Sequence, residues 1–229
     1  MATANIAIRD EPEHIRSLLA RLHAESKAQE ANISREDYNN RASMHDVMRD
    51  KFIALDEDKA HYIYQLLRAT GATSIVEAGT SFGVSTIYLT LAALANAKAA
   101  ANGKKALVVA TEHEPTKAAR AREHWKECGD NVVQAIDLRV GDLRETLKTD
   151  LKEVDFLLLD IWTPMALPTL KLVQPHLRHG ALIIADNTVM AADSYTEFLN
   201  YIRAPGSGFI DTTVPFEGGL ELMVYAPSQ

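Results

Sequence analysis

Two apolar runs of the chain end in oxygen-bearing side chains of the kind that bind cations. Asp160 closes Val154-Asp-Phe-Leu-Leu-Leu-Asp160, and Asp186 and Asn187 close Ala181-Leu-Ile-Ile-Ala-Asp186-Asn187. Ligands of open α/β sheets bind beyond the carboxyl ends of parallel strands, so all three side chains are expected at one site. Their oxygens suit a hard divalent cation such as Mg²⁺. The structural alternatives are an N-cap at Asp160 and a turn at Asp186 and Asn187.

A second chemical signal is the turn after the first expected strand, which has the spacing Glu77-x-Gly79-x-x-x-Gly83. Small residues there let the backbone approach a ligand, and the next helix offers free N–H groups. The spacing differs from Gly-x-Gly-x-x-Gly, which cradles a pyrophosphate. The acidic Glu77 suits a ligand with an ammonium group, such as the methionine end of S-adenosyl-L-methionine.

Acidic residues also follow the second expected strand. Glu112 comes directly after its apolar run, where a carboxylate can accept both hydroxyls of a ribose. Glu114 is the other candidate, but it precedes Pro115 and equally suits the positive N-terminus of the next helix. We therefore favour Glu112 as the ribose ligand.

Three further residues have both a functional and a structural interpretation. Gly141 and Asp142 follow the third expected strand, where they either line an adenine pocket or begin a helix with an N-cap. Trp162 lies beside Asp160 and either stacks on a base or belongs to the core.

The elements that position these residues alternate between strand and helix from residue 74 onward. The expected strands are 74–78, 106–111, 136–140, 154–160, 181–185, 209–214 and 219–225. The expected helices are 85–101, 115–128, a short one near 143–150, 164–177 and 193–203. Such alternation implies right-handed crossovers and a parallel sheet. The last two strands have only a Gly-Gly turn between them, so the final strand should be antiparallel.

The N-terminal part has no strand signal. Three helices are expected there, beginning near Pro12, near Ser34 and at Asp56. We expect one domain over residues 1–229, with 1–70 as a helical cap and 71–229 as the α/β core. Its fold class is α/β: a seven-stranded, mostly parallel sheet with an antiparallel last strand and helices on both faces.

Composition excludes several classes of partner. The net charge of −7 disfavours nucleic acid, whose binding needs a clustered basic surface. No apolar run approaches the ~20 residues that span a bilayer, so no membrane partner is expected. The one cysteine, Cys128, fits a reducing compartment. Acids at Asp10, Glu11 and Glu13 disfavour a transit peptide, so we expect a cytoplasmic protein, with a mitochondrial location as the alternative.

These residues, in this order, resemble the cation-dependent class I O-methyltransferases, the group of catechol and caffeoyl-CoA O-methyltransferases. The resemblance covers about residues 55–227. Ile75-Val-Glu-Ala-Gly-Thr-Ser-Phe-Gly-Val-Ser85 looks like the first motif of that family. Asp160-Ile-Trp162 looks like its Asp-x-Trp, and Gly219-Leu-Glu221 looks like its Gly-Leu-Glu. The resemblance implies the Rossmann-like class I methyltransferase fold.

The resemblance also implies roles for individual residues. It places Asp160, Asp186 and Asn187 as metal ligands, and it makes Asp160 and Glu221 catalytic, with Glu221 beside the substrate hydroxyls. The implied contacts to S-adenosyl-L-methionine come from Glu77, Gly79, Ser85, Glu112, Gly141, Asp142, Leu143, Asp160 and Trp162.

One position departs from the family. A lysine follows Asp-x-Trp in catechol methyltransferases and is assigned there as the general base, whereas Thr163 stands at this place. Threonine cannot take a proton at neutral pH, so either the metal does more of the activation, or another group serves, or the activity is reduced.

The expected function is therefore methyl transfer from S-adenosyl-L-methionine to a hydroxyl of a catechol-type small phenolic molecule, with Mg²⁺ or another divalent cation. A homodimer is expected because relatives in this family often pair through their N-terminal helices. The alternatives are a methyltransferase for a nonaromatic hydroxyl or an amine, and a cofactor-binding protein that has lost its chemistry.

Overall fold

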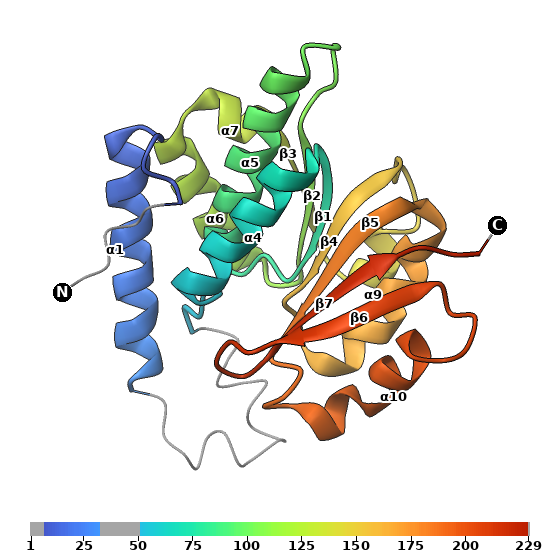
Figure 1. Ribbon diagram of the computed structural model, residues 1–229. Helices are drawn as coiled ribbons and strands as arrows, with labels where there is room; N and C mark the ends of the chain where they lie inside the picture. Colours follow the sequence, from blue (N-terminus) through green and yellow to red (C-terminus); the bar gives the residue numbers. More distant parts are fainter. Residues whose placement is uncertain (1–6, 33–50, 229) are drawn as a thin grey trace.

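The computed structural model describes residues 7–32 and 51–228 (Figure 1). The helix expected from Ser34 lies outside these residues. Within them, no helix is both long and apolar enough to cross a membrane.

A seven-stranded sheet with the order β3-β2-β1-β4-β5-β7-β6 forms the centre of the molecule (Figure 1). The first five strands in this order pair in parallel, whereas β7 is antiparallel to both of its neighbours. This arrangement confirms the predicted fold class. The strands are β1 (Ser74–Ala78), β2 (Leu107–Glu112), β3 (Ile136–Val140), β4 (Val154–Leu159), β5 (Leu177–Asp186), β6 (Phe209–Val214) and β7 (Leu220–Tyr225).

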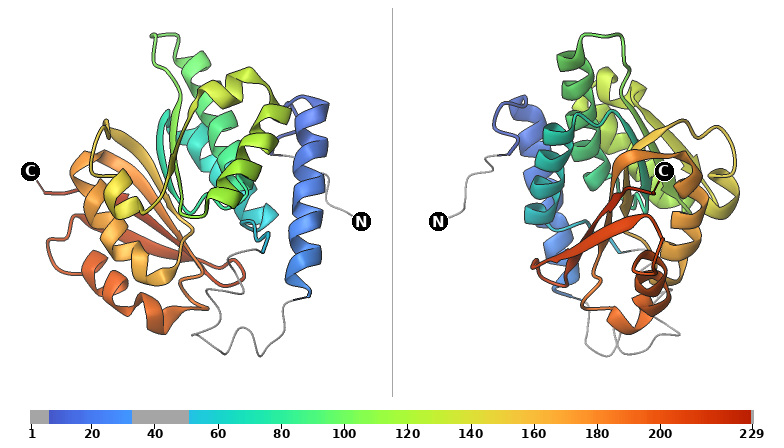
Figure 2. Two further views of the ribbon diagram at one scale, coloured as in Figure 1. Left: turned by 180° about the vertical axis from the view of Figure 1, so that it is seen from behind. Right: turned by 45° about the vertical axis from the view of Figure 1, so that its right-hand side comes forward.

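Helices cover both faces of the sheet, as the two views of Figure 2 show. One face packs against α1 (Glu13–Glu30), α4 (Glu57–Thr70), α5 (Val84–Ala100), α6 (Pro115–Cys128) and α7 (Asp130–Gln134). The other packs against α8 (Leu143–Thr146), α9 (Ala166–Val173) and α10 (Ala192–Ile202). Successive strand residues point to opposite faces, so Ile75 joins the first hydrophobic cluster and Val76 the second.

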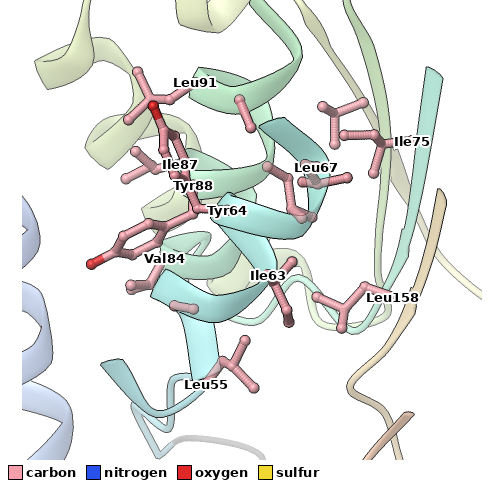
Figure 3. Close-up of a cluster of buried hydrophobic side chains, with 14 of the residues drawn as sticks. Leu55, Ile63, Tyr64, Leu67, Ile75, Val84, Ile87, Tyr88, Leu91 and Leu158 are labelled. Atoms are coloured by element: carbon pink, nitrogen blue, oxygen red, sulfur yellow. The ribbon is translucent and has the colours of Figure 1, made fainter. Parts of the chain in front are cut away.

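The helix α4 belongs to the same core as the sheet. Figure 3 shows Ile63 and Leu67 of α4 among Ile87 of α5 and Leu158 of β4. Both α4 side chains are at most 1% exposed. The position of α4 against the sheet is therefore fixed by packing, which matters for the polar residues at its N-terminal end.

The predicted helix 164–177 is wrong in its extent. The structure has instead a 3₁₀ turn η1 (Thr163–Met165), then α9, then a second 3₁₀ turn η2 (Gln174–His176). Pro175 has no N–H to continue the helical hydrogen bonds, so the chain leaves the helix early and β5 begins at Leu177. The helix predicted near 143–150 is likewise only one turn long, and α7 was not predicted.

Gly79 lets the turn after β1 touch the end of β4. Its φ is +96°, in the left-handed region that favours glycine. A Cβ at this position would lie 1.8 Å from the carbonyl oxygen of Asp160. This glycine therefore sets how closely the turn from Gly79 to Gly83, called the glycine turn below, approaches the end of β4 at Asp160.

We predict that Gly79→Ala destabilises the fold by about 2 to 5 kcal/mol, combining left-handed strain with overpacking. Gly71→Ala is the matched control, because its φ is also positive, at +69°, but nothing lies within 4 Å of the added Cβ. Urea unfolding measures both. Equal losses in the two variants would contradict the close approach.

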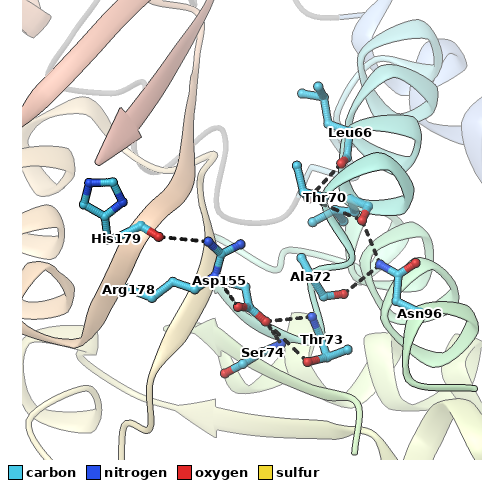
Figure 4. A network of polar contacts seen from close by, with 10 residues as sticks. Leu66, Thr70, Ala72, Thr73, Ser74, Asn96, Asp155, Arg178 and His179 are labelled. Atoms are coloured by element: carbon cyan, nitrogen blue, oxygen red, sulfur yellow. Dashed lines mark hydrogen bonds and ion pairs between the residues drawn. The ribbon is translucent and has the colours of Figure 1, made fainter. Parts of the chain in front are cut away.

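Asp155 ties together the amino ends of three neighbouring strands (Figure 4). Its buried carboxylate accepts backbone N–H bonds from Thr73 at 2.8 Å and Ser74 at 3.0 Å, and it pairs with Arg178 at 2.6 Å. Burial acts to raise the pKa of Asp155, but these donors outweigh it and hold the pKa below the ordinary 3.8.

A depressed pKa contributes stability above the unfolded value and loses it as the pH falls through the folded value. We predict that Asp155→Ala costs about 2 to 4 kcal/mol at pH 7, because two buried N–H groups lose their acceptor. The difference from the wild type should shrink below about pH 4. Urea unfolding at pH 7 and pH 3 tests this, and a penalty that stays constant would contradict the linkage.

Candidate active site

The predicted juxtaposition of the two acidic strand ends is confirmed. Asp160 directly follows β4, Asp186 is the last residue of β5, and these strands pair in parallel with Leu159 opposite Ala185. Burial, the charge of Asp186 and that of Glu77 together raise the pKa of Asp160 well above its ordinary value. The carboxyl edge of the sheet therefore brings acidic groups together whose ionised forms need a compensating positive charge.

That compensation comes from Lys59, a residue that the sequence reasoning missed. Its Nζ lies 2.8 Å from Oδ1 of Asp186 and 3.0 Å from Oδ2 of Asp56. The side chain is buried, and burial alone would lower the pKa of Lys59, but the two carboxylates outweigh it and raise the pKa. The contact with Asp186 is an ion pair rather than a well-aligned hydrogen bond.

Asn187 also turns toward Asp186. Its Nδ2 donates to Oδ2 of Asp186 at 2.9 Å, and its own φ is +60°. Its Oδ1 lies against Gly218 of the β6–β7 turn, where a Cβ would come within 2.4 Å. The β6–β7 turn therefore packs directly on this end of β5.

The oxygen donors predicted for Mg²⁺ are thus present but already engaged. One oxygen of Asp186 faces the Lys59 ammonium and the other accepts from Asn187. A divalent ion at Asp186 would stand beside a buried positive charge and be repelled by it. Among residues 7–32 and 51–228, no group of three or more His, Cys, Asp or Glu side chains is arranged to hold a metal. As placed, this donor set does not fit a divalent cation.

The glycine turn holds Glu77 in its interior. The Glu77 carboxylate is fully buried and accepts hydroxyl bonds from Thr80 at 2.8 Å, Ser85 at 2.6 Å and Thr86 at 2.5 Å. Burial raises its pKa, although the hydroxyls oppose that shift. The Glu77 and Ser85 side chains therefore bond to each other here, and their implied cofactor contacts stay predictions.

Glu112 stands where the ribose carboxylate was predicted. Its two oxygens accept backbone N–H bonds from Ser81 at 2.8 Å and Glu114 at 2.7 Å. A carboxylate has about four acceptor positions, so each oxygen can still accept a hydroxyl. The residue thereby links the glycine turn to the end of β2.

A small cavity of about 10 Å³ lies beside the glycine turn and reaches Asp160. Its other wall is the segment before α4, including Ile53, which accepts a bond from the Ser81 hydroxyl at 3.2 Å. The same segment is held from behind by α1, where Ser26 accepts a bond from Ala54 N at 2.9 Å. N-terminal residues thus cover this pocket.

Gly141, Asp142 and Leu143, which the resemblance assigns to the cofactor, make different contacts in the structure. Gly141 N donates to the Glu112 carbonyl at 2.9 Å, which joins the β3 end to the β2 end. Asp142 caps α8 by accepting from Arg144 N, as the structural alternative had it, and bonding to Arg144 lowers its pKa to about 2. Leu143 is buried against the α8–α10 face.

Trp162 and Thr163 lie just after the Asp160 strand end. Trp162 is 42% exposed, which leaves much of its indole at the surface. Thr163 begins the turn η1 and is half-buried.

The expectation that Glu221 lies beside the acceptor stays a prediction, but the structure places this side chain away from Asp160 and Asp186. Glu221 pairs with Ala185 across the sheet, one residue away from the Leu220–Asp186 pair, so its side chain points to the opposite face. There it is buried and bonds to Arg203 at 2.8 Å and Thr213 at 2.7 Å. The structure does not bring Glu221 to the Asp160–Asp186 cluster.

Three solved structures share this fold over nearly their whole lengths. Cofactor-bound Rv0187 from MTB has 22% identity and a TM-score of 0.70, with 93% of this chain and 91% of that one covered. The Bacillus cereus O-methyltransferase in complex with SAH has 18% identity, a TM-score of 0.66, and coverage of 92% and 99%. TomG from Streptomyces achromogenes, an O-methyltransferase in complex with SAM, has 19% identity, a TM-score of 0.67, and coverage of 91% and 98%.

Comparison with curated proteins finds no match to the chain. A family model described as a methyltransferase domain matches residues 76–188, which run from β1 to the turn after β5. This range contains the glycine turn, Glu112, Asp160 and Asp186. Residues 76–188 therefore match a methyltransferase domain, and the chain shares the fold of the two O-methyltransferases named above.

Proposed function

We propose that this protein is an S-adenosyl-L-methionine-dependent O-methyltransferase that acts on a small phenolic molecule. The observation that carries the proposal is a single pocket that places the glycine turn beside Asp160, with Glu112 bonded to the same turn. The methyltransferase domain and the similarity to O-methyltransferases, one of them in complex with SAM, support it.

The cofactor is held by backbone and carboxylate groups at the ends of β1 and β2. Gly79 has no side chain, so the turn lies directly against the end of β4 at Asp160, where we propose that the cofactor binds. Glu112 accepts the ribose hydroxyls with its remaining acceptor positions. Gly141, after β3, and Trp162, after β4, are the residues proposed to contact the adenine.

The reaction is an in-line displacement: the acceptor hydroxyl loses its proton to solvent, its oxygen bonds to the methyl carbon, and the sulfonium sulfur leaves with the electrons of the C–S bond. Holding both partners in line converts a bimolecular step into a local one, and this is the main contribution of the protein. Asp160 lines the pocket next to the turn and is the residue proposed to contact the reacting hydroxyl.

A catechol-type acceptor is part of the proposal because Asp160 and Trp162 form the Asp-x-Trp sequence beside the pocket. The Mg²⁺ dependence predicted from the sequence remains a prediction, and the placement of Lys59 argues against it. No step is therefore assigned to a metal.

The proposal is tested with methyl-labelled S-adenosyl-L-methionine and catechol, with phenol as the acceptor that lacks the adjacent hydroxyl. We expect labelled product from catechol and much less from phenol. Cofactor binding is measured separately by calorimetry. Binding without transfer to any phenolic, nonaromatic or amine acceptor would favour a cofactor-binding role, and absence of cofactor binding would contradict the proposal.

We predict that Glu112→Gln weakens cofactor binding about tenfold to a hundredfold, because charged hydrogen bonds are worth about 1.5 to 3 kcal/mol. Glu114→Gln is the matched control and should bind nearly as the wild type does. Calorimetry gives the affinities, and thermal unfolding confirms that both variants are folded. A larger loss in Glu114→Gln would assign the ribose to that carboxylate instead.

A further inference from the structure

We propose that the Lys59 ammonium is the resident cation of the active site, in the place that the sequence assigns to a divalent metal, and that methyl transfer by this chain needs no divalent cation. The inference deepens the proposed methyltransferase function and rests on it. Its evidence is the placement of Lys59 between Asp186 and Asp56.

The fold delivers Lys59 to this place through α4. Lys59, Ile63 and Leu67 recur every four residues and share one face of the helix. All three are at most 1% exposed, so the lysine lies on the face that packs against the core. A lysine on such a face is costly to bury unless it is paired, and here two carboxylates pair with it.

Asp56 makes the position of the ammonium specific. It precedes the first residue of α4 and contacts Lys59 one turn later, with its own side chain half-exposed. Lys59 is therefore held from both sides, by the start of its own helix and by the end of β5. An ammonium group held by two carboxylates keeps its charge at a fixed point, as a bound ion would.

The ammonium also completes the charge balance of the cluster. Asp160 and Asp186 lie at adjacent strand ends and would repel each other without a cation. Lys59 attracts both carboxylates, through a direct ion pair with Asp186 and at longer range with Asp160. A divalent ion would need the Asp186 oxygen that Lys59 already faces.

For the reaction, Lys59 is a positioning residue. It is buried and acts through Asp186 and through its fixed positive charge beside the ends of β4 and β5. Positive charge near the acceptor favours its phenolate form, which is the role that a metal would have. This also explains how the chain manages with Thr163 where catechol methyltransferases have a lysine.

The test measures Mn²⁺ binding by the electron paramagnetic resonance of free Mn²⁺, together with methyl transfer to catechol in Mg²⁺ and in EDTA. The full-length wild type should bind no Mn²⁺ and should work equally well in both buffers. Wild-type protein that binds one Mn²⁺, with the binding abolished in Asp186→Asn, would overturn the proposal, and so would a loss of activity in EDTA.

Lys59→Met removes the charge but keeps the apolar stem, so the unpaired carboxylates should now recruit one Mn²⁺ per chain. Its transfer rate should fall about tenfold or more in EDTA and recover with Mg²⁺. Lys59→Arg keeps the charge and should bind no Mn²⁺. A folded Lys59→Met that binds no Mn²⁺ would show that this is not a cation position and would also overturn the proposal.

If Lys59→Met does not fold, the Mn²⁺ and EDTA measurements on the wild type still decide whether this site holds a divalent cation. Mn²⁺ binding is measured without any acceptor, so its outcome is separate from that of the function. If catechol is not methylated, the proposed acceptor fails while the Mn²⁺ result still tests the role of Lys59.

Discussion

The ion pair between Lys59 and Asp186 connects the helices that precede the first strand to the carboxyl edge of the sheet. Asp186 ends β5 at the carboxyl edge of the sheet, and Lys59 comes from α4, which precedes the first strand. Neither charge tolerates burial alone, because an unpaired buried ion costs several kcal/mol. Each therefore fixes the other, and the helix that carries Lys59 is held at the site by electrostatics as well as by packing.

The same constraint explains the other polar contacts around the pocket. The buried Glu77 carboxylate receives three hydroxyl groups, and Glu112 receives two backbone N–H groups from the turn regions beside it. These bonds join the ends of β1 and β2 to the glycine turn. A surface preorganised in this way can bind a charged cofactor with little rearrangement, which is what methyl transfer requires of its binding site.

Much of the fold could be predicted from the sequence because local patterns decided it. Strands at 74–78, 136–140 and 209–214 have the predicted bounds, because a glycine or proline lies directly beyond at least one end of each. The helix predicted over 164–177 ends earlier in the structure because Pro175 has no N–H to continue the helical hydrogen bonds. Local pattern alone thus gave the order of the elements better than it gave their ends.

The candidate site was predicted less completely, because it depends on contacts between distant segments. Lys59 was missed, although its four-residue spacing from Ile63 placed a lysine on an apolar helix face. Glu221 was assigned to the acceptor from a motif, but strand alternation after Leu220 turns it to the other face. In both cases the side-chain direction within an element carried the missing information.

The most direct test of Lys59 as the resident cation is a crystal structure of the wild-type chain with S-adenosyl-L-homocysteine. The crystals are grown in Mn²⁺ and measured at the manganese absorption edge. The account predicts cofactor density over the glycine turn beside Glu112, Lys59 still paired with Asp186, and no anomalous peak between Asp160 and Asp186. A manganese peak coordinated by these carboxylates, with Lys59 displaced, would contradict it.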